Sequence, residues 1–234
     1  MTSETSCPAL TVMSSMATRH VLSDLISVYE RRSGSRVSLV SVGGVEAARR
    51  IRAGEGCDIV VLAAEALRRL GDDGWVDPGS TVDVARSRIA VAVPADAPRP
   101  DITSEQSVRE AILHARKVGY STGPSGNHII ALLKHWGVHE TVSPRLVEAP
   151  PGVPVGSLVA DGTVELGFQQ MSELIHQTGI DIVGMLPSPI EGEAIFSAAV
   201  SSSTTNLAAA QGFLMQLIAP ESDALKIRHG MQPV

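Results

Sequence analysis

Three short loops of this 234-residue chain place hydroxyl side chains, glycines or both directly before a predicted helix. They read MSSMATRH at 13–20, VGGVEAAR at 42–49 and YSTGPSGNH at 120–128. Hydroxyls and free backbone N–H groups at a helix N-terminus form a site for an anion. The third loop lacks the Gly-Lys-Ser/Thr ending of a nucleotide P-loop, so the predicted ligand is a small anion and not a nucleotide. Plain helix capping and tight strand-to-helix turns are the alternative explanation.

Two later loops could add further donors. APPGVPVGS at 149–157 is stiffened by proline, and FQQMSE at 168–173 carries two adjacent amides, of which we expect one to face the ligand. The predicted ligand-binding residues are Ser14, Ser15, Arg19, Gly43, Gly44, Ser121, Thr122, Gly123, Ser125, Val155, Gln169 and Gln170.

Three titratable side chains next to these loops could move a proton. They are His20 and His128, with Glu46 as a weaker third. The histidines show no metal-ligand spacing, and Cys7 and Cys57 form neither a disulfide framework nor a tetrahedral metal site. We therefore expect no metal and no cofactor.

Composition restricts the partners. Hydrophobic residues make up 44% and charged residues 19%, which excludes intrinsic disorder. The net charge of −6 and the 3% aromatic content argue against nucleic acid and against an anionic membrane. No apolar run approaches the roughly 18 residues of a membrane span, so no membrane insertion is expected. The start MTSETSCPALTV has no basic segment, which predicts a cytoplasmic protein as written, or a periplasmic one if an upstream leader has been removed.

Apolar periodicity alternates between strands and helices along the chain, which indicates parallel α/β sheets with crossover helices. Strands are expected at 9–13, 37–42, 59–63, 89–93, 118–120, 164–169, 180–186 and 195–200, with helices between and after them. The segments near 81–93 and 186–200 are the natural crossings between two lobes. Lobe 1 is then 1–84 plus 190–234, and lobe 2 is 85–189. Ligands of such sheets bind beyond the carboxyl ends of the strands, where the loops above lie.

Long stretches of the chain resemble the periplasmic molybdate-binding protein family. They include LTVMSSMATRHVLSDLISVYERRSG, YSTGPSGNHIIALLKHWGV and PPGVPVGSLVADGTVELGFQQMSEL. The resemblance implies the class II periplasmic-binding-protein fold, with two α/β lobes and one anion in a cleft between them. True molybdate binders carry hydroxyl donors where this chain has Ala17, Gly43 with Gly44, and Gln169 or Gln170. Arginines such as Arg19 could instead pair with carboxylates.

One branch of the same superfamily consists of aconitate isomerases, which move a proton along an allylic carboxylate. The resemblance therefore implies two functions. The first is isomerisation of a small organic carboxylate by proton transfer. The alternative is the substrate-binding protein of an ABC importer for molybdate or another small anion, with the ABC permease as its partner.

Overall fold

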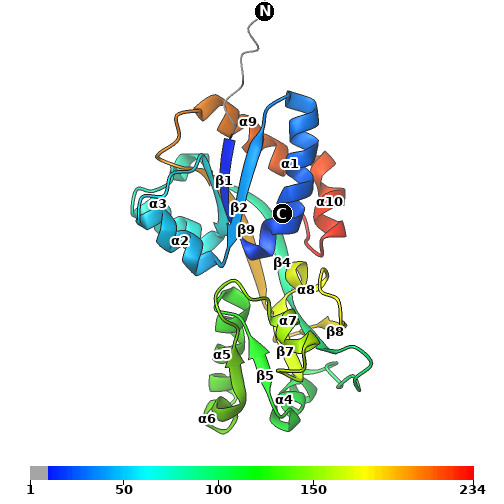
Figure 1. The fold of residues 1–234 in the computed structure, drawn as a ribbon. Helices are drawn as coiled ribbons and strands as arrows, with labels where there is room; N and C mark the ends of the chain where they lie inside the picture. The colour runs from blue at the N-terminus through cyan, green and yellow to red at the C-terminus, as the bar shows by residue number, and fades with distance from the viewer. Residues whose placement is uncertain (1–9) are drawn as a thin grey trace, which may run out of the picture. The chain divides into compact units, whose positions relative to one another are not determined.

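The computed structural model describes residues 10–234, which form two compact units (Figure 1). The described part of unit 1 runs to Ala85 and includes Ile195–Arg228 and Gln232–Val234, while unit 2 holds Arg86–Ala194 and His229–Met231. The sequence predicts crossings after residues 84 and 189, and the structure divides after residues 85 and 194. Ala9, the predicted start of the first strand, and Cys7 lie outside the described residues.

Unit 1 contains a sheet of order β2-β1-β3-β9. β1 pairs in parallel with β2 and β3, as the alternating pattern predicts, but β9 is antiparallel to β3. The unit 1 sheet is therefore mixed, because the chain returns from unit 2 directly into β9 without a crossover helix. The strands are β1 (Leu10–Ser15), β2 (Val37–Val42), β3 (Ile59–Ala63) and β9 (Glu193–Val200).

Helices cover both faces of this sheet. Helices α2 and α3 pack on one face over a core that includes Met13, Ile51 and Leu70, and α1 and α10 lie on the other side (Figure 1). Helix α1 ends at Gly34, whose φ of 71° is the left-handed conformation that glycine adopts without strain. The helices of unit 1 are α1 (Arg19–Ser33), α2 (Gly44–Arg52), α3 (Ala64–Asp72), α9 (Leu207–Ile218) and α10 (Asp223–Arg228), with 3₁₀ turns at Met16–Thr18, Pro78–Ser80 and Pro220–Ser222.

In unit 2 the strand order is β4-β7-β5-β6, with β8 paired to β4, and the pairing is again mixed. β5 is parallel to β6 and β7, whereas β4 is antiparallel to β7 and β8. One core lies between the sheet and helices α4 and α5, and a smaller one lies under α7. The strands are β4 (Val82–Pro94), β5 (Val118–Tyr120), β6 (Leu146–Glu148), β7 (Leu166–Gln170) and β8 (Ile180–Met185). The helices are α4 (Glu105–His114), α5 (Pro124–His135), α6 (His139–Val142), α7 (Val155–Ala160) and α8 (Met171–Leu174), with a 3₁₀ turn at Ser143–Arg145.

The strand ends place the predicted loops within each unit. β1 leads into the 3₁₀ turn before α1, β2 into α2, β5 into α5 and β7 into α8. Among residues 10–234, no helix is long and apolar enough to cross a membrane.

Candidate functional site

The predicted residues fall into two sets, one in each unit. Unit 1 contains Ser14, Ser15, Arg19, His20, Gly43, Gly44 and Glu46, and unit 2 contains Ser121, Thr122, Gly123, Ser125, His128, Val155, Gln169 and Gln170.

In unit 1 the end of β1 places a buried hydroxyl at the start of α2. Ser15 is 5% exposed, and its Oγ has no hydrogen-bond partner in the described part of the chain. A Cβ on Gly44, the first residue of α2, would lie 3.7 Å from the Ser15 Cβ. The preceding residue, Gly43, has no side chain to cap the first turn of the helix. An uncapped helix N-terminus next to an unpaired hydroxyl suits an anion.

The neighbouring hydroxyl of Ser14 is used inside the protein. Its Oγ lies 2.7 Å from the Ser41 Oγ of the adjacent strand β2. Ser14 thus joins the ends of two strands, and Ser15 is the hydroxyl of the pair with no hydrogen-bond partner among residues 10–234. Arg19, the first residue of α1, is exposed, and His20 next to it is half-buried.

Glu46 is held as a carboxylate by two arginines of its own helix. Arg49 Nε and Arg50 Nε donate to its carboxyl oxygens at 2.7 and 2.8 Å. These hydrogen bonds lower the pKa of Glu46 to about 2. A carboxyl with this pKa stays ionised near neutral pH, so Glu46 is poorly suited to carry a proton.

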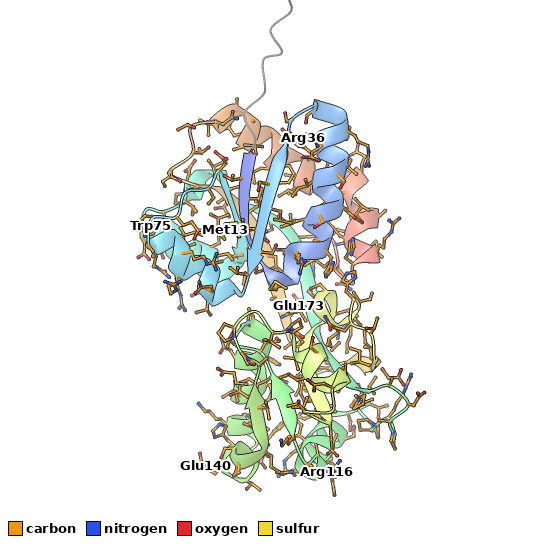
Figure 2. The ribbon with its side chains drawn as sticks, viewed as in Figure 1. Met13, Arg36, Trp75, Arg116, Glu140 and Glu173 are labelled. Atoms are coloured by element: carbon orange, nitrogen blue, oxygen red, sulfur yellow. The ribbon has the colours of Figure 1, made fainter. Side chains whose placement is uncertain are left out.

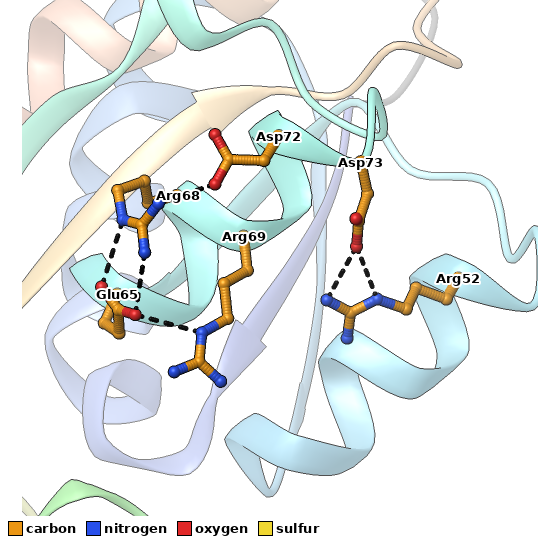
Figure 3. Close-up of polar contacts among 6 residues, drawn as sticks. All are labelled: Arg52, Glu65, Arg68, Arg69, Asp72 and Asp73. Atoms are coloured by element: carbon orange, nitrogen blue, oxygen red, sulfur yellow. Dashed lines mark hydrogen bonds and ion pairs between the residues drawn. The ribbon is translucent and has the colours of Figure 1, made fainter.

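Other arginines of unit 1 are occupied by surface ion pairs. Arg68 pairs with Glu65 and Asp72, and Arg52 pairs with Asp73 (Figure 3). Such exposed pairs contribute little to stability. They satisfy these guanidinium groups, so the abundance of arginine is by itself no sign of a carboxylate site.

In unit 2 the loop between β5 and α5 folds tightly onto the first turn of the helix. The Ser121 Oγ lies 2.8 Å from the Ser125 Oγ and accepts a 3.3 Å bond from the Gly123 N–H. A Cβ on Gly126 would lie 1.6 Å from the Ser121 carbonyl oxygen, so this position requires glycine. Ser121 and Thr122 line a depression of about 650 Å³ within unit 2. The loop has the compact form expected of an anion cradle.

The two adjacent glutamines of β7 have different surroundings. Both polar atoms of the Gln169 amide are hydrogen-bonded, because its Oε1 accepts the Gly156 N–H at 3.3 Å and its Nε2 donates to Glu173 at 2.8 Å. Gln170 is 2% exposed, and neither polar atom of its amide has a partner among the described residues. An unpaired buried amide is costly, so Gln170 is the glutamine suited to bind a ligand.

His128 lies on the face of the unit 2 sheet that α5 covers. Its Nε2 is 3.0 Å from the carbonyl oxygen of Ile190. A Cβ on Gly192 would touch both the His128 ring and the side chain of Ile89, which is the antiparallel partner of Gln170. The Ile190 carbonyl favours a proton on Nε2 and leaves Nδ1 as an acceptor.

Sequence reasoning missed Glu173, the last residue of the FQQMSE loop. This side chain lies where β7 gives way to α8 (Figure 2). Burial raises the pKa of Glu173 to about 7, against the opposing effect of the Gln169 hydrogen bond. The sequence signal that could have identified Glu173 is its position four residues after Gln169, the last residue of the predicted strand 164–169. Val155, by contrast, is fully buried at the start of α7, so only its backbone could reach a ligand.

No cluster of three or more His, Cys, Asp or Glu side chains that could hold a metal occurs in the described residues.

Comparison with known proteins identifies the fold and family. The family model described as "Bacterial extracellular solute-binding protein" matches residues 10–232. The chain is 31% identical over 230 residues to an aconitate isomerase from a Pseudomonas species, covering 96% of this chain and 88% of that protein.

Solved structures show the same fold. The periplasmic molybdate-binding protein of Azotobacter vinelandii superposes with a TM-score of 0.78 at 24% identity, covering 95% of this chain and 98% of that one. The sulfate-binding protein of Mycobacterium tuberculosis gives a TM-score of 0.79 at 17% identity, covering 97% and 87%. These matches confirm the predicted class of two α/β lobes and the predicted resemblance to molybdate-binding proteins.

Proposed function

Because the chain belongs to the bacterial extracellular solute-binding protein family, we propose that it binds a small organic carboxylate anion and isomerises it by proton transfer. The observation that carries this proposal is the 31% identity with an aconitate isomerase over nearly the whole chain. Fold alone does not decide between binding and catalysis, so the chemistry of the site must support the choice.

The unpaired donors support a carboxylate ligand. Ser15 offers a buried hydroxyl at a helix N-terminus, and Gln170 offers a buried amide whose N–H groups can donate to a carboxylate oxygen. Proton abstraction next to a carboxylate also needs donors that stabilise the enolate-like negative charge as it develops. Neutral donors of this kind can stabilise that charge without a metal.

A second candidate is a binding protein for an inorganic oxyanion that delivers its ligand to a transporter. The family description favours it, as do structural neighbours named for molybdate, sulfate and tungstate. Against it stand Ala17, Gly43 and the glutamines of β7, where the molybdate-binding family presents hydroxyls.

A ligand screen by thermal shift separates the two proposals. The panel contains molybdate, tungstate, phosphate, citrate, cis-aconitate and trans-aconitate, since a tight ligand raises the melting temperature by mass action. Each positive carboxylate is then incubated with the protein in deuterium oxide and followed by proton NMR.

Deuterium incorporation or formation of the geometric isomer supports the isomerase. Binding of molybdate or tungstate with every carboxylate inert contradicts the isomerase and supports the binding protein. Ser15→Ala in unit 1 and Gln170→Leu in unit 2 test the two sets of donors separately. Each substitution should lower the affinity for the ligand that raises the melting temperature of the wild-type protein.

A further inference from the structure

The segment from Gln169 to Glu173 has a carboxyl whose surroundings differ from those of the other candidate acids. Glu173 Oε1 accepts the Gln169 Nε2 at 2.8 Å, and Gln169 in turn accepts the backbone N–H of Gly156 at 3.3 Å. Gln169 is 2% exposed, so this chain of hydrogen bonds begins in the interior of unit 2. The amide therefore holds the Glu173 carboxyl in one orientation, and no cation is paired with it in the described residues.

Unpaired polar atoms lie next to this carboxyl in the sequence. The Ser172 hydroxyl and both amide atoms of Gln170 are buried without a hydrogen-bond partner among the described residues. Buried polar atoms that remain unpaired are rare in folded proteins and are expected where a ligand completes their bonding. Glu173 thus belongs to a stretch of unit 2 whose unpaired buried atoms are suited to bind a ligand.

Two of the acids and bases predicted from sequence, Glu46 and His128, are engaged by other groups of the protein. Glu46 is held ionised by Arg49 and Arg50. The Nε2 of His128 is engaged by the Ile190 carbonyl, so one of its two nitrogens remains for proton transfer. Burial, in contrast, brings the pKa of Glu173 to about 7, where a group can both accept and return a proton at neutral pH.

We infer that Glu173 is the proton-transfer group of the proposed isomerisation and that Gln169 is its positioning residue. The inference rests on the proposed function. The Glu173 carboxylate takes a proton from the methylene carbon of the substrate, and the C–H electron pair delocalises through the allylic system onto the adjacent carboxylate. Protonated Glu173 then returns a proton to the other end of the allylic system. The double bond shifts and Glu173 regains its charge, so no further reactant is consumed.

The test compares Glu173→Gln with a matched control. Glu110 also accepts a side-chain hydrogen bond from a glutamine four residues earlier, Gln106, but on the exposed surface of α4. Glu110→Gln therefore makes the same chemical change without touching the proposed site. For wild type and both variants, turnover of cis- and trans-aconitate is measured by proton NMR, and binding of trans-aconitate by calorimetry.

We expect Glu173→Gln to lower kcat at least about 100-fold, within the usual range for loss of a general acid or base, with a Kd within about threefold of wild type. Glu110→Gln should match wild type. Gln169→Leu should lower kcat more than it changes KM, and adding it to Glu173→Gln should lower kcat no further, because both act through one group. Glu173→Asp, which keeps the carboxyl, should restore part of the activity.

If the wild-type protein is active and Glu173→Gln retains more than a tenth of its kcat, the inference is overturned and the proposed function stands. A wild-type protein that neither exchanges deuterium nor converts aconitate overturns both. Should Glu173→Gln fail to fold by circular dichroism, Glu173→Asp decides the matter. A wild-type kcat in that variant argues against a positioned proton carrier, and a tenfold loss at unchanged Kd supports one.

Discussion

Replacing Gly126 with alanine tests whether the loop before α5 is as tightly folded as the structure indicates. In an ordinary helix this change stabilises the protein, because alanine has the higher helix propensity by about 1 kcal/mol. At Gly126 the new Cβ would lie 1.6 Å from the Ser121 carbonyl oxygen and 2.8 Å from its carbon. Backbone cannot rotate away as a side chain does, so the loop itself must move.

The expected cost follows from these contacts. A carbon needs roughly 3.5 Å from a neighbouring heavy atom, so the Ser121 carbonyl must shift by nearly 2 Å. Overpacking of this kind costs about 1–3 kcal/mol, and losing the Ser121–Ser125 hydrogen bond costs about 1 more. After the propensity gain is subtracted, Gly126→Ala should lower the free energy of unfolding by about 2 kcal/mol.

Gly212 in α9 provides the matched control. It is exposed, and an added Cβ would meet nothing closer than the Tyr29 Oη at 3.6 Å. Gly212→Ala should therefore raise the free energy of unfolding by up to about 1 kcal/mol. The same substitution in two helices thus has opposite expected signs.

Urea unfolding followed by tryptophan fluorescence measures both changes. Each unit has one tryptophan, Trp75 in unit 1 and Trp136 in unit 2, so a Trp75→Phe background reports unit 2 and a Trp136→Phe background reports unit 1. Gly126→Ala should also lower the affinity of any anion that binds at this loop. A stabilising Gly126→Ala, or one that leaves stability and binding unchanged, would refute the tight packing of residues 121–126.

Three further changes have expected outcomes. Ser15→Ala should weaken ligand binding by about 1.5–3 kcal/mol in calorimetry without lowering the apo melting temperature, because its hydroxyl has no hydrogen-bond partner among the described residues. Arg19→Ala should weaken anion binding by at least about 1.5 kcal/mol, and an unchanged affinity would remove Arg19 from the site. Glu173→Gln should raise apo stability at pH 8 by at most about 3 kcal/mol and leave it unchanged near pH 4. The sign follows because burial raises the folded pKa to about 7 from 4.5, so wild type loses stability as pH rises between these values, and urea titrations at both pH values measure it.

Elements with a clear apolar period could be predicted from sequence with accurate ends. The strands at 37–42 and 59–63 have the predicted bounds, because each is an apolar or alternating run of five or six residues. The strand at 118–120 also has the predicted bounds, although it is too short to show a period. Helix α5 begins at Pro124, five residues before the predicted start at Ile129. Its first turn, Pro-Ser-Gly-Asn, has no apolar period, although proline is well suited to the first position of a helix.

Short or shared elements could not be predicted in this way. β6 and α6 span three and four residues, too few to show a period. β4 extends over 13 residues, although only 89–93 read as a strand, because polar residues such as Asp83, Arg86 and Ser87 interrupt the pattern before them. That strand carries the chain from unit 1 into unit 2, and its first half buries Val84, Ala85 and Ser87 although its sequence shows no apolar run.

Residue type and position found the candidate loops, but local sequence could not show which atoms the fold would satisfy. The sequence does not distinguish Ser14 from Ser15, yet the neighbouring strand provides a hydrogen-bond partner, Ser41, for Ser14 alone. The acidity of Glu46 likewise depends on arginines one helical turn away, and that of Glu173 depends on burial. These properties arise from tertiary contacts.

The two adjacent glutamines of β7 differ in their hydrogen bonding, because one side chain bonds within the protein and the other is unpaired among the described residues. Successive side chains of a strand point to opposite faces, so adjacent glutamines cannot share one set of neighbours. Gln169 uses both polar atoms to join Gly156 to Glu173, whereas Gln170 keeps both atoms unpaired. Because the Gly156 N–H holds Gln169, we expect a ligand that bonds to Gln170 to leave the orientation of Glu173 unchanged. For the proposed isomerisation we therefore expect Gln170→Leu to alter binding and Gln169→Leu to alter proton transfer.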